Sequence, residues 1–192
     1  MHRTTADIVQ SWSKTDPIEA LEWAKAQDSE IGRVVAAEKL AYKDAAGVLK
    51  LLENAWASGQ ELGYSFDKAL ANIADHAPGL LFQSALLEQL DEIPSDVIKY
   101  VANKSPAQAV ALMEQYNTKA NLEDIAEIWL EQDANAAATW VGQLPQGTLD
   151  EIASRFAVTS AAKDSQAART WVNESLPKNS KAYQEALSEF EP

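Results

Sequence analysis

Apolar positions recur along the chain at intervals of three and four residues, which is the spacing of one face of an α-helix. The clearest example is residues 129–145, WLEQDANAAATWVGQLP, where an Asp lies four residues after one Trp and seven before another. An Asp, Asn or Ser at such a point accepts hydrogen bonds from the free N–H groups of a helix start. The pattern predicts two helices that meet at Asp133.

The same arrangement begins at Asp16 and Asp164 and, in variant form, at Ser105. In each copy a small residue lies four positions after the start and a large apolar residue seven positions after it. These two positions share one helix face, where the small residue lets a neighbouring helix approach. Weaker copies begin near 44 and 77, so successive starts are 28–33 residues apart. A period in this range, with two helices per unit, is typical of an α-solenoid.

We therefore expect an all-α fold, a right-handed α-solenoid of about six helical hairpins with an N-terminal capping helix over residues 5–14. No linker or break in composition interrupts the pattern, so a single domain over residues 1–192, with about thirteen helices and no strand, is predicted. One helix is expected over residues 79–92. The residues predicted to cap helix starts are Asp16, Ser29, Asp44, Ser65, Ser105, Asp133, Thr148 and Asp164.

Composition narrows the class of protein without naming its function. Hydrophobic residues make up 46% of the chain, which is too many for a disordered protein. No apolar run approaches the roughly 18 residues of a membrane span, and no signal peptide is visible. Cysteine is absent, which excludes disulfides and thiol chemistry. We expect a soluble protein, either cytoplasmic or exported with its signal removed.

The chain is strongly acidic, with a net charge of −13. This charge argues against direct nucleic-acid binding, which needs a basic face, and is compatible with a basic partner. Glu123, Glu127 and Glu131 are spaced by four and form one row on a predicted helix, within a segment (114–151) that has eight acidic residues and one lysine. The row is a candidate docking site for a basic peptide. The alternative is a solvated outer helix face.

A second candidate surface is the stretch around two nearby glycines, residues 57–64, which is longer than the other predicted turns. Loops on a rigid scaffold often have a binding function, so Gln60, Glu61 and Tyr64 are candidate partner-binding residues. The alternative is a plain connector. Six tryptophans, at 12, 23, 56, 129, 140 and 171, are best explained by packing between hairpins; lining a binding groove is the other interpretation.

The sequence contains no cluster of residues that predicts catalysis. Of the two histidines, His2 lies at the terminus and His76 lies beside Asp75 at a predicted helix junction, where a capping or turn role is expected. Helical metal-site spacings, phosphate-binding glycine loops and calcium loops are all absent from the sequence. We predict no cofactor, no metal and no catalytic residues, hence no enzyme; a helical enzyme is the least favoured alternative.

Two segments resemble the opening of tetratricopeptide-like repeats, Asp-Pro-x-x-Ala-x-x-Trp: Asp16-Pro17-Ile-Glu-Ala20-Leu-Glu-Trp23, and residues 133–140, DANAAATW. Most units are shorter than the family's repeat, so the chain resembles a divergent relative or a HEAT-like solenoid. The resemblance implies a concave surface that binds proteins or peptides. We therefore expect a non-enzymatic protein- or peptide-binding scaffold. The alternative is an acidic inhibitor, a nucleic-acid mimic that docks on a basic protein by charge.

Overall fold

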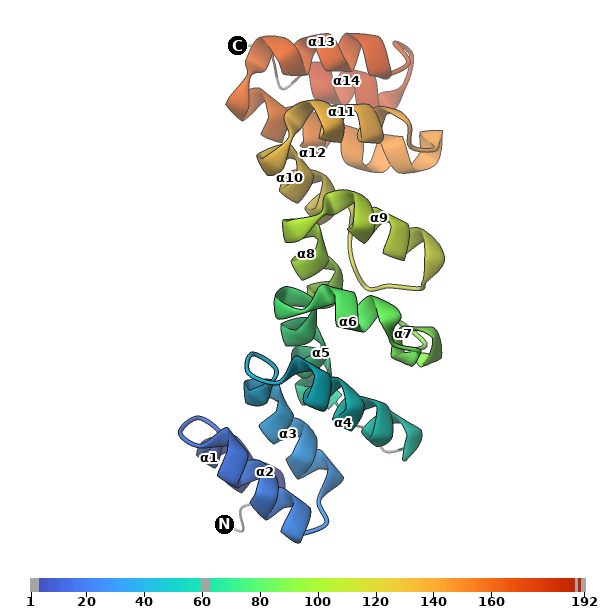
Figure 1. The fold of residues 1–192 in the computed structure, drawn as a ribbon. Helices are drawn as coiled ribbons and strands as arrows, with labels where there is room; N and C mark the ends of the chain where they lie inside the picture. Colours follow the sequence, from blue (N-terminus) through green and yellow to red (C-terminus); the bar gives the residue numbers. More distant parts are fainter. Residues whose placement is uncertain (1–3, 60–62, 189, 191–192) are drawn as a thin grey trace. The chain divides into compact units, whose positions relative to one another are not determined.

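The computed structural model describes residues 4–59, 63–188 and 190. Within these residues the chain is all-α, as predicted, and has fourteen helices (Figure 1). The helices are α1 Thr5–Trp12, α2 Pro17–Ala26, α3 Glu30–Leu40, α4 Ala45–Ala57, α5 Gly63–His76, α6 Pro78–Gln83, α7 Leu86–Gln89, α8 Ser95–Lys104, α9 Pro106–Gln115, α10 Leu122–Gln132, α11 Ala134–Gly142, α12 Gln146–Lys163, α13 Ser165–Ser175 and α14 Lys181–Ser188. No described helix has the length and apolar character needed to cross a membrane.

Contacts divide the chain into two compact units. Unit 1 comprises Met1–Val101 and Ala111–Lys119, and unit 2 comprises Ala102–Val110 and Ala120–Pro192. A division by contacts does not show whether the two units fold independently. The single domain over residues 1–192 therefore stays a prediction.

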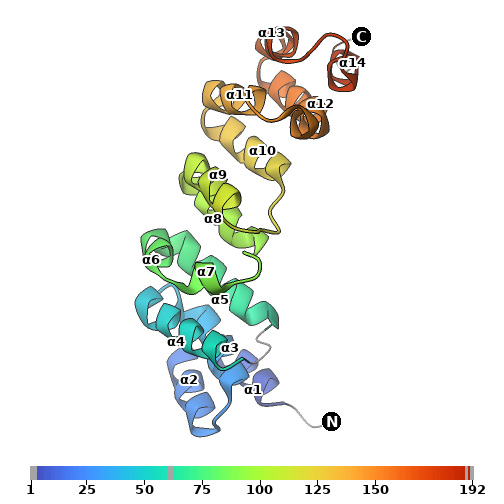
Figure 2. The same cartoon turned by 90° about the vertical axis from the view of Figure 1, so that its right-hand side faces the viewer.

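In each unit one helix contacts most of the others. In unit 1, α1, α3 and α5 form one layer and α2, α4 and α6 the other, and α3 packs against α1, α2, α4 and α5 (Figure 2). In unit 2, α12 holds the same central place against α10, α11, α13 and α14. Small residues dominate the core around the first helices of unit 1, where Ala20, Ala24 and Ala36 are fully buried. Such small side chains let the helix axes approach closely.

Side-chain caps begin these helices where the sequence predicts them. Asp16, Asp44, Asp133 and Asp164 each accept a hydrogen bond, at 2.9–3.0 Å, from the backbone N–H three residues later. The predicted cap at Ser29 is also confirmed, and Asn121 caps α10 in the same way. The residues four positions after the predicted starts are buried, at most 3% exposed: Ala20, Val48, Ala109, Ala137 and Ala168.

The tryptophans that flank the same capping Asp contact each other. The ring centroids of Trp12 and Trp23, on either side of Asp16, are 6.2 Å apart. Those of Trp129 and Trp140, on either side of Asp133, are 5.3 Å apart in a stacked arrangement. These contacts confirm the packing interpretation for the two pairs, since each ring covers its partner across the junction between two helices.

The predicted helix over residues 79–92 is wrong, because the chain breaks it at Ser84. The Ser84 hydroxyl accepts the N–H of Leu86 at 3.0 Å and donates to the Glu53 carboxylate at 2.7 Å. These side-chain hydrogen bonds replace helical ones, and Ser84 takes an extended backbone (ψ 139°) that separates α6 from α7. The break adds one helix to the number predicted.

Two other predicted helix starts are also wrong. Helix α5 begins at Gly63, so Ser65 lies inside its first turn. Helix α12 begins at Gln146, two residues before the predicted cap at Thr148. The reason is that the carbonyl of Pro145 already accepts the Leu149 N–H at 2.9 Å.

The sequence also did not predict the isolated parallel bridge between Ile93 and Thr118. In this bridge the Ile93 N–H donates to the Asn117 carbonyl at 2.8 Å, and the Lys119 N–H donates to the Ile93 carbonyl at 3.0 Å.

Replacing Asp133 tests the contribution of a cap. Asp133→Ala removes the acceptor of the Ala136 N–H and should lower the free energy of unfolding of unit 2 by about 1 kcal/mol, whereas Asp133→Asn keeps an acceptor and should lose a few tenths at most. Urea unfolding followed by circular dichroism measures both. Equal losses in the two variants would assign the effect to charge and contradict the capping role.

Candidate functional site

The acidic row on α10 is occupied by basic side chains of the same unit. Arg155 on α12 donates to Glu127 at 2.7 Å and to Glu123 at 3.1 Å, and Lys163 lies 2.9 Å from Glu131. The hydrogen bond to Glu127 raises the pKa of Arg155. A basic peptide would have to displace these pairs, which as exposed ion pairs contribute little to stability. The docking role of the row stays a prediction, and its available charge is smaller than the sequence indicates.

The second predicted surface is described only in part. Gln60 and Glu61 lie outside the described residues. Tyr64 is 71% exposed, and the Lys68 ammonium lies 5.2 Å from its ring centroid. Lys68 also pairs with Asp96, and that hydrogen bond raises the pKa of Lys68. The Lys68 charge is therefore already engaged within unit 1.

His76 belongs to a polar network that joins α3 to α5. Its Nδ1 lies 3.2 Å from Asp75, and its ring contacts the Tyr42 ring edge-on at 4.2 Å. The Tyr42 hydroxyl donates to the buried Asn72 at 2.8 Å, and Asn72 donates to the Glu38 carbonyl at 2.8 Å. Burial raises the pKa of Tyr42. The network satisfies a buried amide between two helices, which is a structural role.

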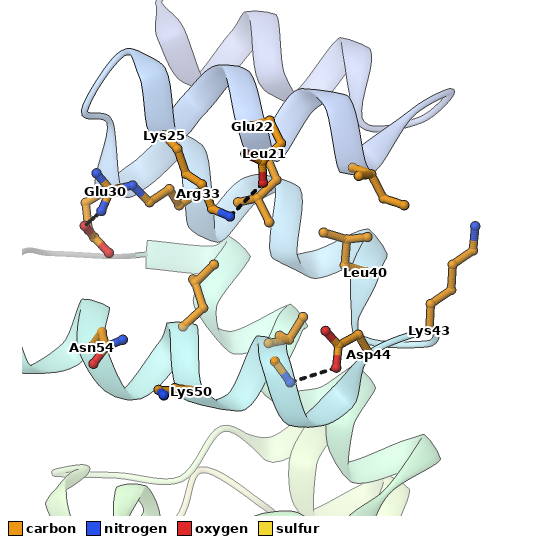
Figure 3. Close-up of a pocket in the computed structure, with 14 residues that line it drawn as sticks. Leu21, Glu22, Lys25, Glu30, Arg33, Leu40, Lys43, Asp44, Lys50 and Asn54 are labelled. Carbon is orange, nitrogen blue, oxygen red and sulfur yellow. Dashed lines mark hydrogen bonds and ion pairs between the residues drawn. The ribbon is translucent and has the colours of Figure 1, made fainter.

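A groove in unit 1 lies between α2 and α4, with side chains of α3 between them (Figure 3). We call it the α2–α4 groove; its volume is about 710 Å³. Its apolar lining consists of Ile18, Leu21, Leu40, Val48 and Leu51. Ile18, at the edge of the groove, is 58% exposed.

The charged residues of this groove divide into engaged and unengaged groups. Lys25 pairs with Glu22 at 2.7 Å, and Arg33 pairs with Glu30 at 2.8 Å (Figure 3). The Asp44 carboxylate caps α4.

Lys43 and Lys50 are different, since neither ammonium group has an ion-pair or hydrogen-bond partner within the described part of the chain. The groove thus presents two exposed cations beside an apolar surface.

A second groove, in unit 2, lies between α11 and α13 and has a volume of about 470 Å³. We call it the α11–α13 groove. When the two grooves are aligned on Asp44 and Asp164, six lining residues of each occupy the same positions: the cap itself and three, four, six, seven and ten residues after it. In the α2–α4 groove these are Asp44, Gly47, Val48, Lys50, Leu51 and Asn54; in the α11–α13 groove they are Asp164, Ala167, Ala168, Thr170, Trp171 and Glu174.

The correspondence extends to the other walls of the grooves. A lysine precedes each cap, Lys43 in one groove and Lys163 in the other. On the facing helix of the α2–α4 groove, the lining residues Ile18 and Leu21 lie two and five residues after Asp16. On the facing helix of the α11–α13 groove, the lining residues Asn135 and Ala138 lie at the same distances after Asp133. The same sequence positions therefore build a groove in each unit.

The two grooves differ in how far their own side chains fill them. Trp171 crosses the α11–α13 groove and donates its Nε1–H to the Ala138 carbonyl at 2.9 Å, and its ring contacts Phe156 edge-on at 4.9 Å. The corresponding residue in the α2–α4 groove is Leu51, whose side chain is too short to cross the groove. Lys163 is held by Glu131, whereas Lys43 has no such partner among the described residues.

A smaller hollow of about 280 Å³ in unit 1 holds a perturbed carboxylate. Burial raises the pKa of Asp67, an effect that Asp96 increases and that Lys119 and Lys68 oppose. A perturbed carboxylate in a hollow is a common feature of catalytic sites but also of structural ones. Among the described residues, no group of three or more His, Asp or Glu side chains is arranged to hold a metal ion.

Comparison of the chain with protein-family models, with curated proteins and with solved structures gives no match.

The sequence analysis missed the lysines at 43 and 50 as candidate functional residues. Their positions, one before and six after a capping Asp, were a usable signal, because the same positions line the groove of the other unit. Whether a lysine is paired depends on side chains far away in sequence, which the pattern does not reveal.

The pH dependence of stability tests the Asp67 environment. Because its folded pKa is raised, Asp67 binds a proton more tightly in the folded state, and stability falls as pH rises from the unfolded pKa through the folded one. Asp67→Asn should therefore raise the urea midpoint at pH 7 and have little effect at pH 3. The exposed Glu88→Gln on α7 is the control. A lower midpoint for Asp67→Asn at pH 7 would contradict burial as the dominant cause.

Proposed function

We propose that this chain is a divergent helical-repeat protein, tetratricopeptide-like or HEAT-like, that binds peptide segments of a partner protein in grooves between alternate helices. On this proposal the repeat starts predicted at 16, 44, 77, 105, 133 and 164 begin the hairpins of a right-handed α-solenoid, with α1 as its capping helix. The protein acts as a scaffold and not as an enzyme.

One observation carries the proposal: equivalent positions line a groove in both units, between the helix that begins at one capping Asp and the helix that begins at the next. A groove built by the repeating part of a sequence is a property of the architecture, and repeat architectures use such surfaces for binding. The lining also fits a peptide, since apolar side chains lie beside polar groups that can fix orientation.

The acidic-inhibitor alternative receives less support from the same structure. It depends on a free acidic surface, and the most regular acidic row is engaged by Arg155 and Lys163. High salt separates the two functions, because a charge-driven complex weakens when exposed charges are screened, and a complex held by apolar burial weakens little.

A peptide selection on the whole protein tests the proposal. Random displayed peptides of about 12 residues, roughly 18 Å long as helices, are selected on the 192-residue protein. Ile18→Asp should weaken binding of one class of selected peptides about tenfold or more, because it places a charge on the apolar wall of the α2–α4 groove.

The matched control is Ile31→Asp on α3, since Ile31 is also exposed (45%) but does not line the groove. A second class of peptides should respond to Ala167→Phe, which fills the α11–α13 groove from an exposed position. If no peptide is selected, or if every selected peptide tolerates both groove substitutions, the proposed function is wrong.

A further inference from the structure

We infer that the α2–α4 groove takes an acidic peptide segment of a partner protein, one that combines apolar side chains with aspartate or glutamate. The inference rests on the proposed peptide-binding function and names the chemistry of the peptide. It reverses the expectation drawn from net charge, which pointed to a basic partner.

The first support is the state of the charges around the groove. Lys25 and Arg33 already have carboxylate partners, at 2.7 and 2.8 Å, and Asp44 is committed to capping α4. Lys43 and Lys50 remain, with no partner within the described residues. In a chain with 29 acidic and 16 basic residues, two unengaged lysines beside one groove are the unusual feature. Carboxylates on a bound peptide would complement both.

The net charge of −13 does not prevent this binding. At physiological ionic strength, exposed charges are screened over about 8 Å, so a ligand responds to the charges that line its site more than to the sum over the chain. Between α2 and α4, four lining residues are basic and three are acidic. The groove is locally basic on an acidic protein.

The equivalent groove of unit 2 provides the contrast. The position of Lys50 is held there by Thr170 and that of Asn54 by Glu174. The lysine before the cap, Lys163, is paired with Glu131 at 2.9 Å. The feature that selects an acidic peptide is therefore specific to the α2–α4 groove and does not follow from the architecture alone.

The apolar part of the ligand follows from the lining. Ile18, Leu21 and Leu51 present apolar surface on both sides of the groove, and Ile18 is more than half exposed without a ligand. Burying that surface favours binding in proportion to its area. Residues 44–54 extend roughly 15 Å along α4. A bound peptide of the same length would have about ten residues as a helix or about five as an extended chain.

The experiment compares two charge-matched double variants in the same peptide selection. Lys50→Thr/Asn54→Glu gives the α2–α4 groove the residues of the equivalent groove and lowers its charge by two. Lys14→Thr/Gln10→Glu makes the same charge change at exposed positions of unit 1 outside the groove. Urea unfolding of both variants establishes that they fold, which is expected because all four positions are exposed.

We expect the peptides that Ile18→Asp weakens to be rich in Asp and Glu and in Leu, Ile or Phe. They should bind Lys50→Thr/Asn54→Glu about tenfold more weakly and Lys14→Thr/Gln10→Glu without change. Basic or neutral groove peptides, or acidic ones that tolerate Lys50→Thr/Asn54→Glu, would overturn the inference and leave the proposed function standing. Absence of any groove-dependent peptide would overturn both.

Two other occupants would also overturn the inference. Sedimentation of the unliganded protein as a dimer that Lys50→Thr/Asn54→Glu dissociates would assign the groove to a second copy of this chain. Single-stranded DNA that displaces the selected peptides from the α2–α4 groove, at a salt concentration where peptides of the α11–α13 groove stay bound, would assign the α2–α4 groove to a nucleic acid.

Discussion

A helix must satisfy the free N–H groups of its first turn, and at four of the six predicted repeat starts this chain does so with an aspartate side-chain oxygen. Asp16, Asp44, Asp133 and Asp164 accept the N–H three residues later, which fixes the residue at which each helix begins. Once the start is fixed, the residues four and seven positions later share one helix face. A small buried residue then meets the neighbouring helix, and the larger side chain lies one turn farther along.

The same constraint positions the grooves. The central helices α3 and α12 pack closely against helices on both sides, because their own and their neighbours' small residues permit it. The helices on either side of them, α2 with α4 and α11 with α13, then border a hollow that their exposed faces line. Residue size at a few positions decides how open each hollow is. Leucine at 51 leaves the α2–α4 groove open, and tryptophan at 171 reaches across the α11–α13 groove to the Ala138 carbonyl.

Local patterns predicted what local interactions determine. The caps at Asp16 and Asp133, the burial of Ala20 and Ala137, and the all-α class all follow from residues within one turn of each other. The failures involve partners that are distant in sequence: Ser84 ends α6 with the help of Glu53, and the 93–118 bridge joins segments that flank α8 and α9. The charge available on the acidic row was overestimated for the same reason, since Arg155 and Lys163 pair with glutamates that lie about 30 residues earlier.

These ion pairs change what net charge says about a partner. If only the net charge of the whole chain is considered, Glu123 and Glu127 are available to a ligand and Lys50 is one of a minority of cations. In the folded protein the glutamates share Arg155, whereas Lys50 has no partner among the described residues. Exposed ion pairs contribute little to stability, yet they decide which charges are left for a ligand. For this protein the informative quantity is the charge that folding leaves unpaired, and within the α2–α4 groove that charge is positive.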